Sequence, residues 1–172
     1  MTLGMSIETF TIVHVVLSLL GIVTGLVVLL GLIAGKGLQG WTAAFLAATV
    51  LTSVTGFGFP FERLLPSHIV GVLSLVVLAV AILARYRLGL AGRWRRTYVI
   101  GATVALYFNV FVLVVQAFLK LPTLRDLAPK QTEAPFVVAQ VLVLLLFVVL
   151  GSLATVRFRG EHVSPLGAQR VL

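Results

Sequence analysis

Five long apolar runs that contain no Asp, Glu, Lys or Arg decide what this chain can fold into. They cover about residues 9–34, 41–59, 67–84, 97–119 and 135–156. Each run is close to the roughly 20 residues that a helix needs to cross the hydrocarbon core of a bilayer. Only 10% of the residues are charged, against about 25% in soluble domains. The sequence therefore predicts an all-α integral membrane protein with a bundle of five transmembrane helices.

The second run is the least apolar of the five, because it is rich in Ala, Thr and Ser. It could be a re-entrant segment, but Gly and Lys flank one end and Gly and Pro the other, which favours a full crossing. The first run is not typical of a cleaved signal peptide, since it follows no basic segment and is too long for the apolar part of one. We expect one transmembrane domain over residues 1–159 and a flexible, polar cytoplasmic tail over residues 160–172.

The basic residues sort to one side of the membrane when the five runs cross it. Nine of the 13 Lys and Arg residues lie opposite the N-terminus, on what we call the basic side: Lys36, Arg85, Arg87, Arg93, Arg95, Arg96, Arg157, Arg159 and Arg170. Because basic loops stay in the cytoplasm, we expect the N-terminus outside and the C-terminus in the cytoplasm. The net charge of +8 then indicates contact with anionic lipid heads and no nucleic acid as partner.

The composition excludes several chemistries. The chain has no cysteine, which rules out disulfides, Cys-ligated iron–sulfur centres, covalent c-type haem and thiolate zinc sites. It also lacks the phosphate-binding, zinc-protease and serine-hydrolase motifs. Its halves show no repeat of the kind found in inverted-repeat transporters. No catalytic residue is assigned from the sequence.

Two connections on the N-terminal side carry structural signals. The turn at residues 56–61 holds three phenylalanines and two glycines, and it could be the mouth of a ligand site or a simple aromatic rim. In residues 120–134, Leu121, Leu124 and Leu127 recur at helical spacing. This pattern predicts a short helix lying in the membrane interface.

Small and polar residues recur on single faces of the predicted helices. The sets are His14, Ser18, Gly21 and Gly25 on the first run; Ala44, Ala48, Thr52 and Gly56 on the second; and Gly101, Ala105, Asn109 and Gln116 on the fourth. Small residues let membrane helices approach closely, and amides form hydrogen bonds between them. These faces therefore predict helix packing.

Two histidines, His14 and His68, enter the membrane from the N-terminal side. His14 lies roughly 8 Å into the first run at 1.5 Å per residue, and His68 lies near the start of the third. A bis-histidine b-type haem needs one imidazole from each of two helices, so both are candidate iron ligands. A quinone or other polar ligand, or a purely structural role, is an open alternative.

Four neighbouring residues complete this candidate site. Gly71 lies three residues after His68 and would leave space there for a flat cofactor. Ser18 shares the helix face of His14, and Phe57 and Phe59 lie in the aromatic turn on the same side of the membrane. These residues would border a haem or a quinone near the outer surface.

The segments Thr55–Gly71 (TGFGFPFERLLPSHIVG) and His14–Gly25 (HVVLSLLGIVTG) resemble a group of uncharacterised small proteins of the bacterial inner membrane. The resemblance covers most of the chain and implies a multi-pass protein of that membrane, without an activity. The chain is also loosely similar to cytochrome b561-type haem proteins through its helix-borne histidines. It departs from them in its five predicted spans and in lacking the further histidines of two-haem members.

These features leave three functional hypotheses. The first is a small electron-transfer or quinone-interacting protein with one b-type haem, which would exchange electrons with quinone or a membrane redox partner. The second is a non-catalytic accessory subunit or assembly factor of a larger membrane complex. The third is a small transporter or channel. In each case the chain would contact the lipid bilayer and form a homo-oligomer or join a complex.

Overall fold

The computed structural model describes residues 4–59 and 66–159. Its elements are α1 (Ile7–Ile33), α2 (Gln39–Gly56), α3 (Pro66–Ile82), the π-helical turn η1 (Leu83–Arg87), α4 (Arg93–Lys120), α5 (Pro122–Leu127) and α6 (Ala134–Arg157). Every predicted span corresponds to one of the five longer helices, and the predicted short helix is α5. Phe61 of the aromatic turn and the tail over residues 160–172 lie outside the described residues.

Within the described part of the chain, four helices are long and apolar enough to cross a membrane. They cover Ile7–Ile33, His68–Arg87, Arg93–Lys120 and Ala134–Arg157. This confirms an all-helical protein of the multi-pass membrane class. The 18-residue helix α2 is not among the four, because Ala, Thr and Ser dilute its apolar character. A fifth crossing by α2 stays a prediction.

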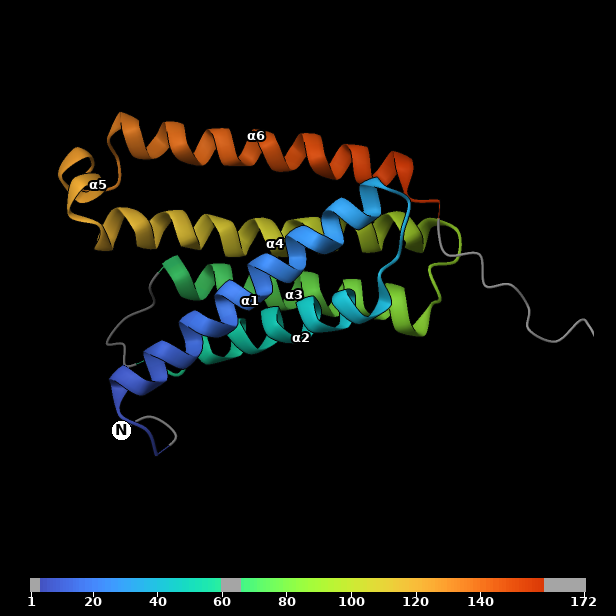
Figure 1. Ribbon diagram of the computed structural model, residues 1–172, viewed down its shortest axis with the longest axis horizontal. Helices are drawn as coiled ribbons and strands as arrows, with labels where there is room; N and C mark the ends of the chain where they lie inside the picture. Colours follow the sequence, from blue (N-terminus) through green and yellow to red (C-terminus); the bar gives the residue numbers. More distant parts are fainter. Residues whose placement is uncertain (1–3, 60–65, 160–172) are drawn as a thin grey trace, which may run out of the picture.

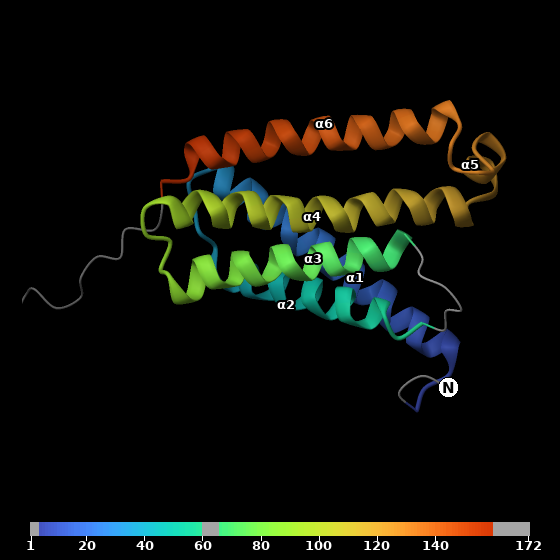
Figure 2. The same ribbon diagram turned by 180° about the vertical axis from the view of Figure 1, so that it is seen from behind.

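The five longer helices run in alternating directions along one axis (Figures 1 and 2). α2 packs against α1, α3 and α4, whereas α6 packs against α4 and α1 at the edge of the bundle. α1 crosses the bundle obliquely: the beginning of α1 lies beside α2, and the end of α1 lies near α6 (Figure 1). α2 therefore packs against three other helices, and α6, the least buried of the four candidate spanning helices, lies at the rim.

Local signals set the ends of α1. The Ser6 hydroxyl accepts a hydrogen bond from the Thr9 backbone N–H at 3.2 Å and so caps the first turn. At the other end Gly35 has a φ of 75°, and the Lys36 N–H donates to the Gly31 carbonyl at 2.8 Å. Glycine adopts this left-handed conformation without steric cost, and the chain can then turn into α2.

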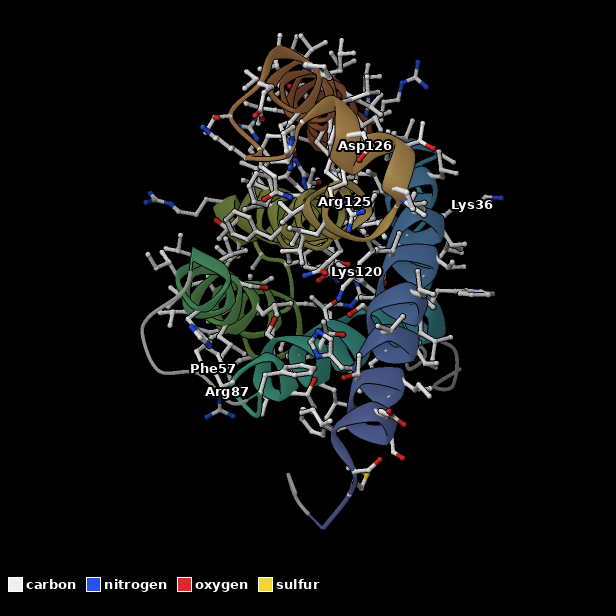
Figure 3. All side chains as sticks on the ribbon, turned by 90° about the vertical axis from the view of Figure 1, so that its left-hand side faces the viewer. Lys36, Phe57, Arg87, Lys120, Arg125 and Asp126 are labelled. Atoms are coloured by element: carbon white, nitrogen blue, oxygen red, sulfur yellow. The ribbon has the colours of Figure 1, made fainter. Side chains whose placement is uncertain are left out.

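The charged residues gather at the two ends of the bundle. Figure 3 looks along the bundle from the end at which α1 begins and labels Lys120, the last residue of α4, and Arg125 and Asp126 of α5. The opposite end holds the described residues of the basic side. The middle section has an apolar exterior, with Leu142 on α6 61% exposed. A surface of this kind suits lipid, not water.

Candidate functional site

His14 is tied to the end of α2. Its Nδ1 lies 2.8 Å from the Thr55 hydroxyl oxygen, and its half-buried ring meets the ring of Phe59 edge to face, with centroids 5.2 Å apart. A Cβ atom at Gly56 would lie 3.7 Å from His14 Cε1, so a small residue there leaves room for the imidazole. The Ser18 hydroxyl donates to the His14 carbonyl at 2.9 Å, which is a bond within α1.

His68 has a separate environment on α3. Its side chain is only 5% exposed and stacks on the ring of Phe57, with centroids 5.7 Å apart. A Cβ atom at Gly71 would lie 3.1 Å from Phe57 Cζ. The space beside Gly71, which the sequence suggested for a flat cofactor, is thus filled by Phe57. One turn further on, the Ser53 hydroxyl donates to Ser74 at 3.1 Å.

The two histidines lie at the same end of the bundle but contact different faces of α2. Thr55 and Gly56 face α1, whereas Ser53 and Phe57 face α3. A haem ligated by both imidazoles would need them to face each other across one slot, and here each ring is packed against residues of the α2 end. The residues present do not form such a slot in this arrangement, and haem ligation stays a prediction.

A second polar contact lies near the middle of α2. The Asn109 amide on α4 donates to the Thr49 hydroxyl on α2 at 3.3 Å. A Cβ atom at Gly21 of α1 would lie 3.1 Å from each of these groups. The glycine therefore lets α1 close over the pair, and three helices meet at a hydrogen bond in the interior.

Thr52 lies between these two contacts, one turn from Thr49 and one turn from Thr55. Its side chain is 8% exposed, and its hydroxyl oxygen is fully buried without a hydrogen-bond partner. Leaving a buried hydroxyl unpaired costs about 1–3 kcal/mol. Proteins usually satisfy such groups with a bound water, so the surroundings of Thr52 are a candidate site for water or another small polar molecule.

The basic end of α2 carries a third polar contact. The hydroxyl of the fully buried Tyr98 on α4 donates to the Thr42 hydroxyl at 3.4 Å, and Thr42 donates to the Gly37 carbonyl at 3.1 Å. The π-helical turn η1 brings Arg85 inward, with its guanidinium carbon 5.1 Å from the centre of the Tyr98 ring. A cation over an aromatic face is a favourable arrangement.

Together these contacts form a row along the interior side of α2, from His14 to Arg85. We call this set the α2 polar row: His14, Thr55, Thr52, Thr49, Asn109, Thr42, Tyr98 and Arg85. From Thr42 to Thr55 it covers about 20 Å at 1.5 Å per residue. The side chains do not form one continuous hydrogen-bonded chain: the Thr52 hydroxyl is unpaired, and between Thr49 and Thr42 the side chains of Phe45 and Leu106 close on Gly25.

Sequence reasoning found only part of this row. It identified His14 as a candidate ligand and placed Thr52 and Asn109 on packing faces, but it treated Arg85 as a loop charge. The π-helical turn that carries Arg85 inward leaves no signal in the hydropathy pattern. The one available signal was the Thr and Ser content of the second run. Hydroxyls find hydrogen-bond partners on a neighbouring helix but not in lipid, so this content indicates a helix that packs against others.

Comparison of the chain with profiles of protein families, with curated proteins and with solved structures finds no match.

Proposed function

We propose that the chain is a multi-pass protein of the bacterial inner membrane that crosses it five times, with the N-terminus outside and the C-terminus in the cytoplasm. We further propose that it conducts protons along the α2 polar row. The observation that carries this proposal is the buried, unpartnered hydroxyl of Thr52, which lies between hydrogen-bonded groups that follow α2 toward both ends. A chain of hydroxyls and bound water can pass a proton without a wide pore.

The outer end of the row and its narrow middle section support a proton in preference to a larger solute. His14, at the outer end, is the kind of side chain that exchanges protons near neutral pH, and polar groups inside membrane proteins commonly mark proton and ion paths. In the middle, Leu106 and Phe45 pack tightly around Gly25, since a Cβ atom there would lie 2.6 Å from Leu106 Cδ1. We expect this apolar section to act as the gate, because hydrophobic constrictions block conduction by excluding water.

A flux assay on the purified protein tests the proposal. The protein is reconstituted into liposomes that contain a pH-sensitive dye. A potassium diffusion potential that is negative inside drives proton entry, whereas a potential of the opposite sign drives proton exit. We expect faster acidification than in protein-free liposomes. Flux that equals the protein-free rate at both polarities would overturn the proposal.

Three substitutions then locate the path. Thr52→Val removes the unpartnered hydroxyl at nearly constant volume and should reduce flux strongly, whereas Thr52→Ser should preserve it. Thr103→Val is the matched control, because Thr103 is similarly buried at 6% exposure but its hydroxyl donates to the Val99 carbonyl outside the row. Equal flux in wild type and Thr52→Val would show that the row only packs the helices.

A b-type haem site is a second candidate function. His14 and His68 lie at one end of the bundle, with His68 5% exposed, but their rings would have to turn away from Thr55 and Phe57 to face each other across a haem. A quinone or a membrane redox partner would then accept the electrons. Protein expressed with sufficient haem should show a Soret band that disappears in His14→Ala and His68→Ala. A protein without that band rules out this candidate.

An accessory role in a larger membrane complex is favoured by α6. Only 6% of its most apolar 18 residues are buried, so most of its surface is free to contact lipid or another subunit. Chemical crosslinking in native membranes from positions on α6 should then capture one defined partner, which could be a second copy of the chain. Capture of lipid alone would count against this role.

A further inference from the structure

A groove of about 490 Å³ runs between α4 and α6 on the outside of the bundle. Its walls are almost entirely apolar and include Ile100 and Tyr107 of α4 and Leu144, Val148 and Val156 of α6. Val148 is 56% exposed and Val156 78%, so the groove opens toward the membrane. It lies apart from the α2 polar row.

Close packing of the two helices forms the floor of the groove. A Cβ atom at Gly151 would lie 2.9 Å from Thr103 Cγ2, so α6 approaches α4 closely at this point. The hydroxyls of Thr103 and Thr155 donate to carbonyls of their own helices at 2.8 and 2.7 Å. The groove therefore presents hydrocarbon and no free hydroxyl from these two residues, which suits an alkyl chain.

The groove is long and ends at the basic side. From Leu144 to Val156 it follows α6 for about 18 Å at 1.5 Å per residue. α6 then ends at Arg157, and α4 begins at Arg93 beside it. A molecule with its chain in the groove would bring its polar head to the arginines at this end.

Arginines surround the basic end of the groove. Arg96 lies one turn before Ile100 on the same face of α4, and both Arg96 and Arg159 are exposed. The Arg95 guanidinium donates to the Arg159 carbonyl at 2.8 Å, which holds the end of the α6 segment against α4. At this end, residues 4–59 and 66–159 contribute no Asp or Glu. The site is thus complementary to a phosphate.

We propose that this groove holds one acyl chain of an anionic phospholipid from the leaflet at the basic side, with its phosphate bound by Arg96 and Arg159. Arginine suits phosphate because its planar group donates several hydrogen bonds. Basic sites between membrane helices are known to select anionic lipid heads, with about 1 kcal/mol for each basic residue near the surface. The groove fixes the chain, and the arginines provide the selectivity.

Lipid retention by the purified protein tests this proposal. The protein is reconstituted in vesicles of equal parts phosphatidylglycerol and phosphatidylcholine, re-extracted in mild detergent, and the lipid that stays bound is measured by native mass spectrometry. We expect about one retained phosphatidylglycerol per chain in preference to phosphatidylcholine. Inorganic phosphate at the same concentration should not displace it, because the chain contributes to binding.

Matched variants separate the groove from the general surface. Val148→Trp fills the groove and should lower lipid retention. Val149→Trp adds the same side chain outside the groove and should not, although both valines are 56% exposed. Arg96→Gln should lower retention about fivefold, and Arg87→Gln, at the same end but on η1, should not. Equal retention in all four variants, equal retention of both lipids, or displacement by phosphate would overturn the proposal.

Discussion

At the scale of single residues, Gly25 is the position at which the packing of three helices is most demanding. A Cβ atom there would lie 2.6 Å from Leu106 Cδ1 on α4 and 2.8 Å from ring carbons of Phe45 on α2. Real contacts of this kind are longer, so at least one of these side chains must move. Leu106 and Phe45 can fill the interior of the bundle at this level because residue 25 has no side chain.

The substitution Gly25→Ala should therefore destabilise the protein by about 1–3 kcal/mol, the usual cost of inserting a methyl group into a packed core. The measurement is the thermal melting temperature in detergent, which we expect to fall. Gly40→Ala is the control, because no atom lies within 4 Å of a Cβ there and alanine favours a helix. Similar melting temperatures for the two variants would contradict the packing of α1 against α2 and α4.

At the scale of elements, Glu133 orders the turn between α5 and α6. Its two carboxylate oxygens accept hydrogen bonds from the backbone N–H groups of Lys130 and Thr132, at 3.2 and 3.0 Å. Desolvation acts in the opposite sense, but these donors and the charge of Lys130 hold the pKa of Glu133 below its ordinary value. At pH values above the ordinary pKa of a glutamate, the carboxylate therefore stabilises the turn. This stabilisation is lost as the pH falls through the lowered pKa of Glu133.

Hydrogen exchange over a pH series tests this role. Protection of the Lys130 and Thr132 amides, corrected for the intrinsic exchange rate, should fall in acid for the wild type. Glu133→Gln should show the weak protection at every pH, whereas Asp126→Asn on α5 should behave like the wild type. An acid transition that persists in Glu133→Gln would assign it to another group.

The elements differ in how far the sequence could predict them. Charge-free runs gave the helices, because length and apolarity in a bilayer leave few alternatives, and the spacing of Leu121, Leu124 and Leu127 gave α5. The turn η1 could not be foreseen, since the hydropathy pattern gives no sign that Arg85 would lie over the ring of Tyr98. The helices that pack against α2 could not be predicted either, because a stripe of small residues does not show which helix covers it.

The candidate site was predictable only in its position along the membrane axis. Counting residues from the ends of the runs placed His14 and His68 at one end of the bundle, and the structure has them there. Counting residues could not show that Phe57 would fill the space beside Gly71, or that the rings of His14 and His68 would contact different faces of α2. Rotation of a helix about its own axis is set by packing, which a single sequence does not encode in readable form.

At the scale of the whole molecule, both the five-crossing topology and proton conduction along the α2 polar row require α2 to cross the membrane. Among the five longer described helices, only α2 lacks a stretch apolar enough to span a membrane. One side of it packs against α1, α3 and α4, whereas Trp41, Leu51 and Val54 are exposed. A polar helix can cross a bilayer when its hydroxyls face other helices and its backbone bonds are internal. Alternating helix directions in Figure 1 are consistent with five crossings.

Cysteine labelling of Lys36→Cys, Ala91→Cys and Thr123→Cys tests this claim most directly. The three sites are exposed and lie in the α1–α2 connection, the η1–α4 connection and α5, and the chain has no cysteine of its own. Intact cells are treated with a membrane-impermeant maleimide, before and after permeabilisation of the inner membrane. We predict labelling of Thr123→Cys from outside, and of Lys36→Cys and Ala91→Cys only after permeabilisation. Labelling of Lys36→Cys and Ala91→Cys from opposite sides would contradict the account, because α2 would then not cross the membrane.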